Sequence, residues 1–233
     1  MRPAPDETRF SVGIALVAWF CAFVASAVGA AAVLALTGYL AKDVGDYPLW
    51  LVAVLQLPLW LGQIGALVVV SRWFGTGKPQ RDYGLSFSAV DFVGLPIGLV
   101  AQLVFVPALY WLLSPIIDPD KVGEAAENLT NKADDTLGVV LLVVLVVVGA
   151  PIVEELFFRG LVMRSFQARY NDGLALFASA ALFGLAHFNL YTLPALALFG
   201  LVLGYCAQRT GRLGMSIMAH AGFNAATVAL LLR

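Results

Sequence analysis

The fold class is decided by the stretch Thr136-Leu-Gly-Val-Val-Leu-Leu-Val-Val-Leu-Val-Val-Val-Gly-Ala-Pro-Ile-Val-Glu-Glu-Leu-Phe-Phe158. A helix rises about 1.5 Å per residue, so roughly 20 apolar residues cross the ~30 Å hydrocarbon core of a bilayer. The stretch is long enough for one crossing, and its first charged residue is Glu154. It therefore predicts a transmembrane helix with two adjacent glutamates in its second half.

The composition of the whole chain is typical of membrane proteins. Of its 233 residues, 61% are hydrophobic and 12% are charged, and the mean hydropathy is +0.87. A soluble domain is about half apolar and about a quarter charged, so this chain has too little polar surface to form one. The net charge of −1 provides no basic surface for phosphates, which excludes a nucleic-acid partner. The expected partners are the lipid bilayer and a peptide or protein substrate.

Six further apolar stretches resemble the first in length or approach it. We therefore predict an all-α, polytopic transmembrane bundle of about seven helices. The expected spans lie near Phe10–Gly38, Leu49–Ser71, Ala89–Leu113, Thr136–Phe158, Leu174–Leu190, Leu193–Gln208 and Leu213–Leu232. The fifth and sixth spans are short, and Pro194 marks the turn between them. A short surface helix is expected near Val122–Asn131.

The distribution of lysine and arginine predicts the orientation, because these residues are in excess on the cytoplasmic side. With seven spans, one side of the membrane holds Arg2, Arg9, Arg72, Lys78, Arg81, Arg159, Arg164, Arg169, Arg209 and Arg212, and the other holds Lys42, Lys121, Lys132 and Arg233. The N-terminus is therefore expected in the cytoplasm and the C-terminus outside. The expected location is the cell (plasma) membrane, as a multi-pass protein.

We divide the chain into two parts. Residues 1–135 comprise N-terminal transmembrane helices with an acidic exterior loop at 114–135, and residues 136–233 comprise a helical core that carries the polar residues of the spans. Within the apolar helices, acidic side chains occur only at Glu154 and Glu155, apart from Asp91 at a helix edge. Charges at membrane depth cost roughly 2.5–3.5 kcal/mol each, so a function for them is favoured.

The two glutamates are expected to differ. Glu155 and Arg159 are four residues apart and share a helix face, so a structural ion pair is the favoured role for them. Glu154 points about 100° away from Glu155, and for it we favour a function in chemistry. Pro151 removes a backbone donor one turn earlier and is expected to distort the helix.

Both histidines lie in the last three apolar segments. His187 ends the stretch Phe183-Gly-Leu-Ala-His187, and His220 and Asn224 lie one turn apart on one helix face. A single membrane histidine is more often an interhelical hydrogen-bond donor than a catalyst. Two histidines, an asparagine and a glutamate pair in neighbouring helices instead favour one shared polar site.

These residues carry a resemblance to a family. Glu154-Glu155-x-x-x-Arg159, Phe183-x-x-x-His187 and His220-x-x-x-Asn224, in this order, resemble the three motifs of the CPBP (CAAX protease and bacteriocin-processing, Abi) family of intramembrane endopeptidases. The resemblance covers about Val148–Ala226. It implies that Glu154 and His187 activate a water molecule, that His220 and Asn224 stabilise the oxyanion, and that Glu155 and Arg159 brace the site.

One position departs from the family pattern. Eukaryotic and archaeal CAAX proteases often carry a second histidine two residues after the one matched by His187, and this chain has Asn189 there. The departure weakens the expectation of prenyl-CAAX cleavage more than that of proteolysis.

The residues alone also suit amide hydrolysis, which needs a base for water and donors for the oxyanion. The residues are compatible with chemistry with or without a metal ion. A zinc ion takes three protein ligands in catalytic sites, and Glu154, His187 and His220 are the candidate ligands. Because no HExxH motif is present, we expect metal-free chemistry.

Two other classes of function remain. A non-proteolytic immunity or scaffold protein of the same fold is the main alternative. Such a protein does not need to keep all four of Glu154, His187, His220 and Asn224. A transporter that uses these groups as a proton relay is the second, but transporters commonly show paired halves, whereas these polar groups lie in the last four helices.

Overall fold

The computed structural model describes residues 10–118 and 121–232, and within them the chain is all-α, as predicted. The helices are α1 (Val12–Thr37), α2 (Leu49–Phe74), α3 (Pro79–Tyr83), α4 (Gly94–Val100), α5 (Val106–Leu113), α6 (Glu124–Thr130), α7 (Thr136–Leu142), α8 (Ala150–Glu155), α9 (Arg164–Arg169), α10 (Asp172–Leu185), α11 (Leu193–Thr210) and α12 (Gly214–Leu231). Short 3-10 turns are η1 (Val44–Asp46) and η2 (Ala89–Val93). Three segments are π-helical: η3 (Ala101–Phe105), η5 (Val143–Gly149) and η6 (Leu156–Met163).

Several of these elements join into longer helices. Within the described residues, five helices are long and apolar enough to cross a membrane: Val12–Thr37, Leu49–Phe74, Ala89–Leu113, Thr136–Arg169 and Gly214–Leu231. α10 is apolar but shorter, and α11 follows it after a turn. The chain is a multi-pass integral membrane protein, and helices occupy all of the expected ranges, including the surface helix α6.

Two helix ends differ from the expected ones by more than three residues. The fourth span continues past Phe158 to Arg169, because Leu156–Met163 forms a buried π-helical segment that joins the two halves. The fifth span ends at Leu185 and not at Leu190. Phe188 has a positive φ of 51°, and this left-handed conformation turns the chain out of the helix direction.

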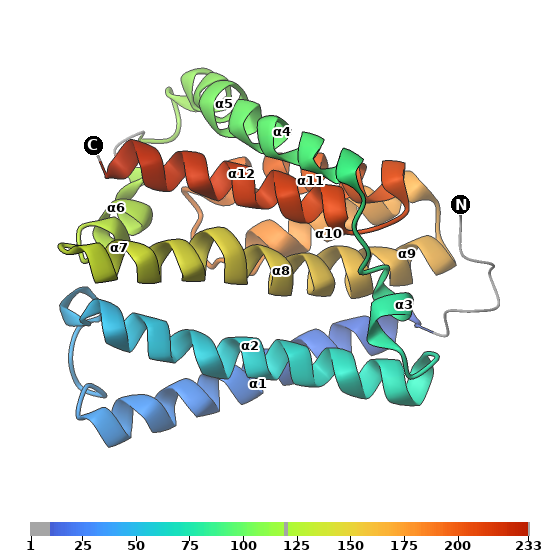
Figure 1. Ribbon diagram of the computed structural model, residues 1–233, viewed down its shortest axis with the longest axis horizontal. Helices are drawn as coiled ribbons and strands as arrows, with labels where there is room; N and C mark the ends of the chain where they lie inside the picture. Colours follow the sequence, from blue (N-terminus) through green and yellow to red (C-terminus); the bar gives the residue numbers. More distant parts are fainter. Residues whose placement is uncertain (1–9, 119–120, 233) are drawn as a thin grey trace.

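The helices form a bundle with two distinct parts (Figure 1). α1 and α2 pair with each other and meet the rest of the bundle at η6, α9 and α8, whereas α12 lies inside, against α4, α11, η5 and α8. The loops between successive helices lie at opposite ends of the bundle (Figure 1). This back-and-forth course is the one expected of spans that cross a bilayer in turn.

Glycines allow close contact between α4 and α12. A Cβ atom built on Gly98 would lie 1.8 Å from the carbonyl oxygen of Ala219, and one on Gly94 would lie 2.3 Å from that of Met215. On the opposite helix, a Cβ on Gly222 would lie 2.3 Å from the Leu95 oxygen. Small residues four apart permit such approach between membrane helices. This contact fixes the position of α12, the helix that carries His220.

Prolines accompany two of the π-helical segments. Pro151 follows η5 and Pro107 follows η3. Because proline lacks an N–H and its ring displaces the preceding turn, the regular hydrogen-bond ladder cannot continue there. The distortion predicted at Pro151 is therefore present, as a widened turn just before the glutamate pair.

Buried carboxylates anchor the loops at one end of the bundle. Asp91, expected at a helix edge, is completely buried and accepts hydrogen bonds from Arg212 at 2.8 and 2.9 Å. Asp82 accepts from Ser71 and from Thr76. The Asp91–Arg212 contact connects the segment before α4 to the turn between α11 and α12. The Asp82 contacts connect α3 to the end of α2.

Candidate active site

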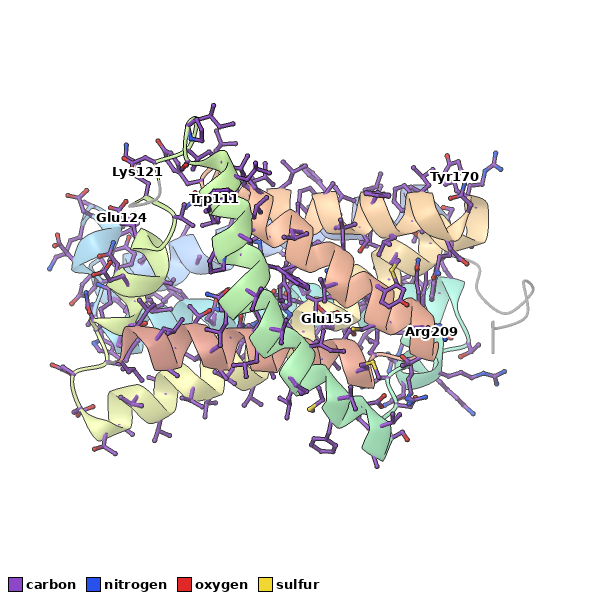
Figure 2. The ribbon with its side chains drawn as sticks, turned by 90° about the horizontal axis from the view of Figure 1, so that it is seen from above. Trp111, Lys121, Glu124, Glu155, Tyr170 and Arg209 are labelled. Atoms are coloured by element: carbon purple, nitrogen blue, oxygen red, sulfur yellow. The ribbon has the colours of Figure 1, made fainter. Side chains whose placement is uncertain are left out.

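The buried ion pair predicted between Glu155 and Arg159 is present. Arg159 Nη1 donates to Glu155 Oε1 at 2.8 Å, and both side chains have no exposed surface. Arg159 Nη2 donates to the carbonyl oxygen of Gly200 in α11 at 3.0 Å, and the guanidinium lies 4.5 Å from the ring centre of Phe183 in α10. Arg159 thereby holds three helices together around the site, near the middle of the bundle, where Figure 2 places Glu155.

His220 joins this pair from α12. Its Nδ1 lies 3.1 Å from Glu155 Oε1, the same oxygen that Arg159 contacts. An ionised carboxylate only accepts hydrogen bonds, so Nδ1 carries the proton in this contact. The other ring nitrogen, Nε2, faces Glu154 Oε2 at 3.8 Å. Glu155 thus fixes the orientation of the imidazole and directs Nε2 toward the neighbouring glutamate.

Glu154 differs from Glu155 in exposure. Its side chain is 20% exposed, whereas that of Glu155 is fully buried. The difference follows from the roughly 100° rotation between adjacent helix residues. Glu154 is consequently the carboxylate of the pair that a water molecule or a substrate can reach.

His187 lies at the end of α10 and is exposed. Its Nδ1 is 2.8 Å from the carbonyl oxygen of Phe183, and its ring meets the Phe183 ring edge-on at 5.0 Å. The Phe183 ring also contacts His220, with centres 5.7 Å apart. Since a carbonyl oxygen only accepts, Nδ1 holds the proton and Nε2 remains free as an acceptor or ligand.

The turn after His187 is held from two sides. The exposed Phe188 ring packs against Phe23 of α1, with centres 5.2 Å apart. Asn189, which stands where related enzymes often have a second histidine, accepts hydrogen bonds from the backbone of Tyr191 and Thr192. The side-chain oxygen of Asn189 is therefore used in the local turn that precedes α11.

Asn224 is attached to the helix that carries the glutamates. Its Nδ2 donates to the carbonyl oxygen of Val146, within η5, at 2.7 Å. A carboxamide has two N–H donors, so one remains for another acceptor. The position one turn from His220 is as predicted.

The predicted site residues are thus brought together to different degrees. Arg159, Glu155, His220 and Glu154 are joined by successive contacts. His187 meets this group through the Phe183 ring, and Asn224 instead contacts the carbonyl oxygen of Val146. Among the described residues, no three His, Cys, Asp or Glu side chains converge in an arrangement that could hold a metal ion. The zinc alternative stays a hypothesis, with Glu154 and His220 as its closest pair of candidate ligands.

Two parts of the site were not predicted from the sequence. Phe183 was noted as a motif residue, but its contacts with Arg159 and both histidines were not foreseen, although it is four residues before His187. The sequence does not indicate that the carbonyl oxygen of Gly200 accepts a hydrogen bond from Arg159. Which backbone oxygen lies within reach of the guanidinium depends only on how the helices pack.

Comparison with known proteins gives two matches. Residues 136–226 match the family model described as type II CAAX prenyl endopeptidase Rce1-like. The chain is also 27% identical over 111 residues, 48% of its length, to a Bacillus subtilis protein named "Putative membrane peptidase YdiL". The matched part spans about half of that relative, 46% of its length. No solved structure matches the chain significantly.

The family match includes the helices that carry the site. The family model begins at the start of α7 and ends within α12, so it contains all three motifs. For this C-terminal part of the chain, the comparisons confirm the resemblance to the CPBP family: residues 136–226 are similar to type II CAAX prenyl endopeptidases.

Proposed function

We propose that the protein is an intramembrane endopeptidase that hydrolyses peptide bonds of membrane-associated proteins or peptides. One observation carries the proposal: a reachable carboxylate, Glu154, faces His220 Nε2 at 3.8 Å, while a fully buried ion pair holds the other imidazole nitrogen. A purely structural ion pair has no need of a second, accessible carboxylate beside it.

In the proposed reaction, Glu154 is the general base. It takes a proton from a water molecule as the water oxygen bonds to the carbonyl carbon of the substrate. The C–N bond then breaks, and the proton passes from Glu154 to the leaving nitrogen. The products are a carboxylic acid and an amine. His187 Nε2, which has a free lone pair in this arrangement, would help to hold the water molecule.

The negative charge that develops on the carbonyl oxygen needs donors in a site of low polarity. When Nε2 of His220 carries a proton, it is such a donor, and the second N–H of Asn224 is another. Glu155 and Arg159 act through His220, because they fix its ring through Nδ1. They are positioning residues in this mechanism.

The family match and the membrane location support two candidate substrate classes. CAAX-type prenylated proteins are one candidate class, by resemblance to the type II CAAX prenyl endopeptidases that residues 136–226 match. Unmodified membrane-associated peptides are the other.

Cleavage in labelled water tests the proposal. The purified full chain in lipid vesicles is incubated with a library of membrane-anchored peptides, with and without a prenylated cysteine, in H₂¹⁸O. We expect products with one ¹⁸O atom in the new carboxyl group. A well-folded protein that cleaves no member of the library would contradict the proposal and favour the immunity or scaffold alternative.

A further inference from the structure

A second feature of the molecule takes no part in the reaction above. It is a groove of about 450 Å³ between α4–η3 and α11. Its walls include Ile97, Phe105, Leu201, Val202, Tyr205 and Arg209. The volume is within the range of roughly 300–1,000 Å³ that is usual for ligand pockets.

The groove results from the divergence of two helices. Figure 2 shows the helix of α4 and α5 close to α11 near Trp111, with the two separating toward the end of α11 where Arg209 is labelled. The lining is almost entirely apolar. Arg209 therefore contributes its aliphatic stem to the wall, and its charged head lies at the edge of the groove.

Arg209 differs from two other arginines near this end of the bundle. Arg212 is paired with Asp91, and Arg164 donates to the Gly211 carbonyl oxygen. Arg209 is exposed, and within residues 10–118 and 121–232 it has no hydrogen-bond or ion-pair partner. The exposed Tyr205 lies one turn before it, and tyrosine favours the boundary between acyl chains and headgroups.

An apolar groove that ends at an unpaired cation, at the end of a transmembrane helix, matches the chemistry of an anionic phospholipid. The acyl chain would lie along the apolar walls, and the phosphate would face the guanidinium. Basic pockets between transmembrane helices are known to bind lipid headgroups of this kind. We propose that this groove is a binding site for an anionic phospholipid, independent of the hydrolytic site.

The test uses the full chain, purified in detergent and titrated with phosphatidylglycerol or phosphatidylcholine of identical acyl chains, with bound lipid counted by native mass spectrometry. The wild type should bind phosphatidylglycerol about fivefold more tightly, since one basic residue near the surface contributes about 1 kcal/mol toward an anionic lipid. Arg209→Gln should remove this preference. Equal affinity of the wild type for both lipids would overturn the proposal.

Two further variants separate the groove from general attraction to basic residues. Arg169→Gln removes an exposed arginine at the same end of the bundle, outside the groove, and it should keep the preference. Leu201→Phe narrows the groove and should weaken the binding of both lipids. An equal loss of preference in Arg169→Gln and Arg209→Gln, or unchanged binding of both lipids by Leu201→Phe, would each contradict the proposal.

Discussion

The polar residues of the candidate site form one chain of contacts, Arg159 to Glu155 to His220 to Glu154. Only the first link could be predicted from the sequence, because Glu155 and Arg159 are one helical turn apart. The link to His220 joins residues 65 positions apart in the sequence. It depends on how α12 packs against α8, and local spacing contains no information about that.

The buried pair makes a prediction about stability. Glu155→Leu should lower the free energy of unfolding by about 3–5 kcal/mol, because it leaves the fully buried Arg159 without its carboxylate. The double variant Glu155→Leu/Arg159→Met should be more stable than either single variant, since both charges leave together. Unfolding of the purified variants by heat or denaturant measures this. A double variant with the summed losses of the two single variants would show that the pair is not coupled.

His220→Gln distinguishes the metal-free mechanism from a zinc mechanism. Glutamine keeps a donor, so we expect residual cleavage, reduced about 10²–10³-fold, which is typical of the loss of one oxyanion donor. We also expect resistance to strong chelators. Stoichiometric zinc in the purified wild type that is absent from His220→Gln, together with activity that chelators remove and zinc restores, would identify His220 as a ligand instead.

The helices themselves could largely be located from hydrophobic length, but their irregularities could not. The π-helical segments before Pro107 and Pro151 have the same apolar composition as the regular helix around them. The left-handed residue after α10 is Phe188 and not a glycine. Proline indicates a distortion in a helix, but whether it becomes a kink or a widened turn depends on the neighbouring helices.

The packing of α4 on α12 contains a signal that was overlooked. Gly94 and Gly98 are four residues apart, a spacing typical of close helix contacts in membranes. On α12, Gly222 lies against Leu95 of α4. The sequence therefore suggests which helix faces can pack closely, and the structure shows that α4 and α12 pack against each other.

This contact predicts the effect of a single methyl group. Gly98→Ala places a Cβ 1.8 Å from the Ala219 oxygen, so α4 and α12 must separate. We expect a loss of about 1–3 kcal/mol in stability, and reduced cleavage because His220 lies one residue after Ala219. Gly65→Ala in α2 is the matched control, since a Cβ there meets nothing within 4 Å. Equal unfolding temperatures for the two variants would contradict the role of this contact.

For the molecule as a whole, the all-α fold and the multi-pass class followed from composition. Within the described residues, five of the seven expected spans are helices long and apolar enough to cross a membrane. Orientation rests on charges at the two ends. Arg159, counted above among the cytoplasmic charges, is buried in the site and contributes nothing to orientation. Arg2, Arg9 and Arg233 lie outside the described residues. Arg72, Lys78, Arg81, Arg164, Arg169, Arg209 and Arg212 still outnumber Lys42, Lys121 and Lys132, so we retain the prediction of a cytoplasmic N-terminus.

Labelling with a membrane-impermeant thiol reagent tests the orientation. In a background with Cys21 and Cys206 replaced, Glu124→Cys in the loop 114–135 should react in intact cells. Lys78→Cys, in the exposed loop between α2 and α3, should react only after the membrane is made permeable. Labelling of Lys78→Cys in intact cells, with Glu124→Cys protected, would reverse the orientation.

The central claim, that Glu154 is the base of a hydrolytic site, is tested most directly by Glu154→Gln. The change is nearly isosteric and removes a charge from a span, so folding should be preserved. Cleavage of a peptide that the wild type processes is measured for the purified variant in lipid vesicles, next to Glu124→Gln, a matched change in α6 that lies outside the site. We expect Glu124→Gln to match the wild type and folded Glu154→Gln to show no cleavage. Full cleavage by Glu154→Gln would contradict the mechanism.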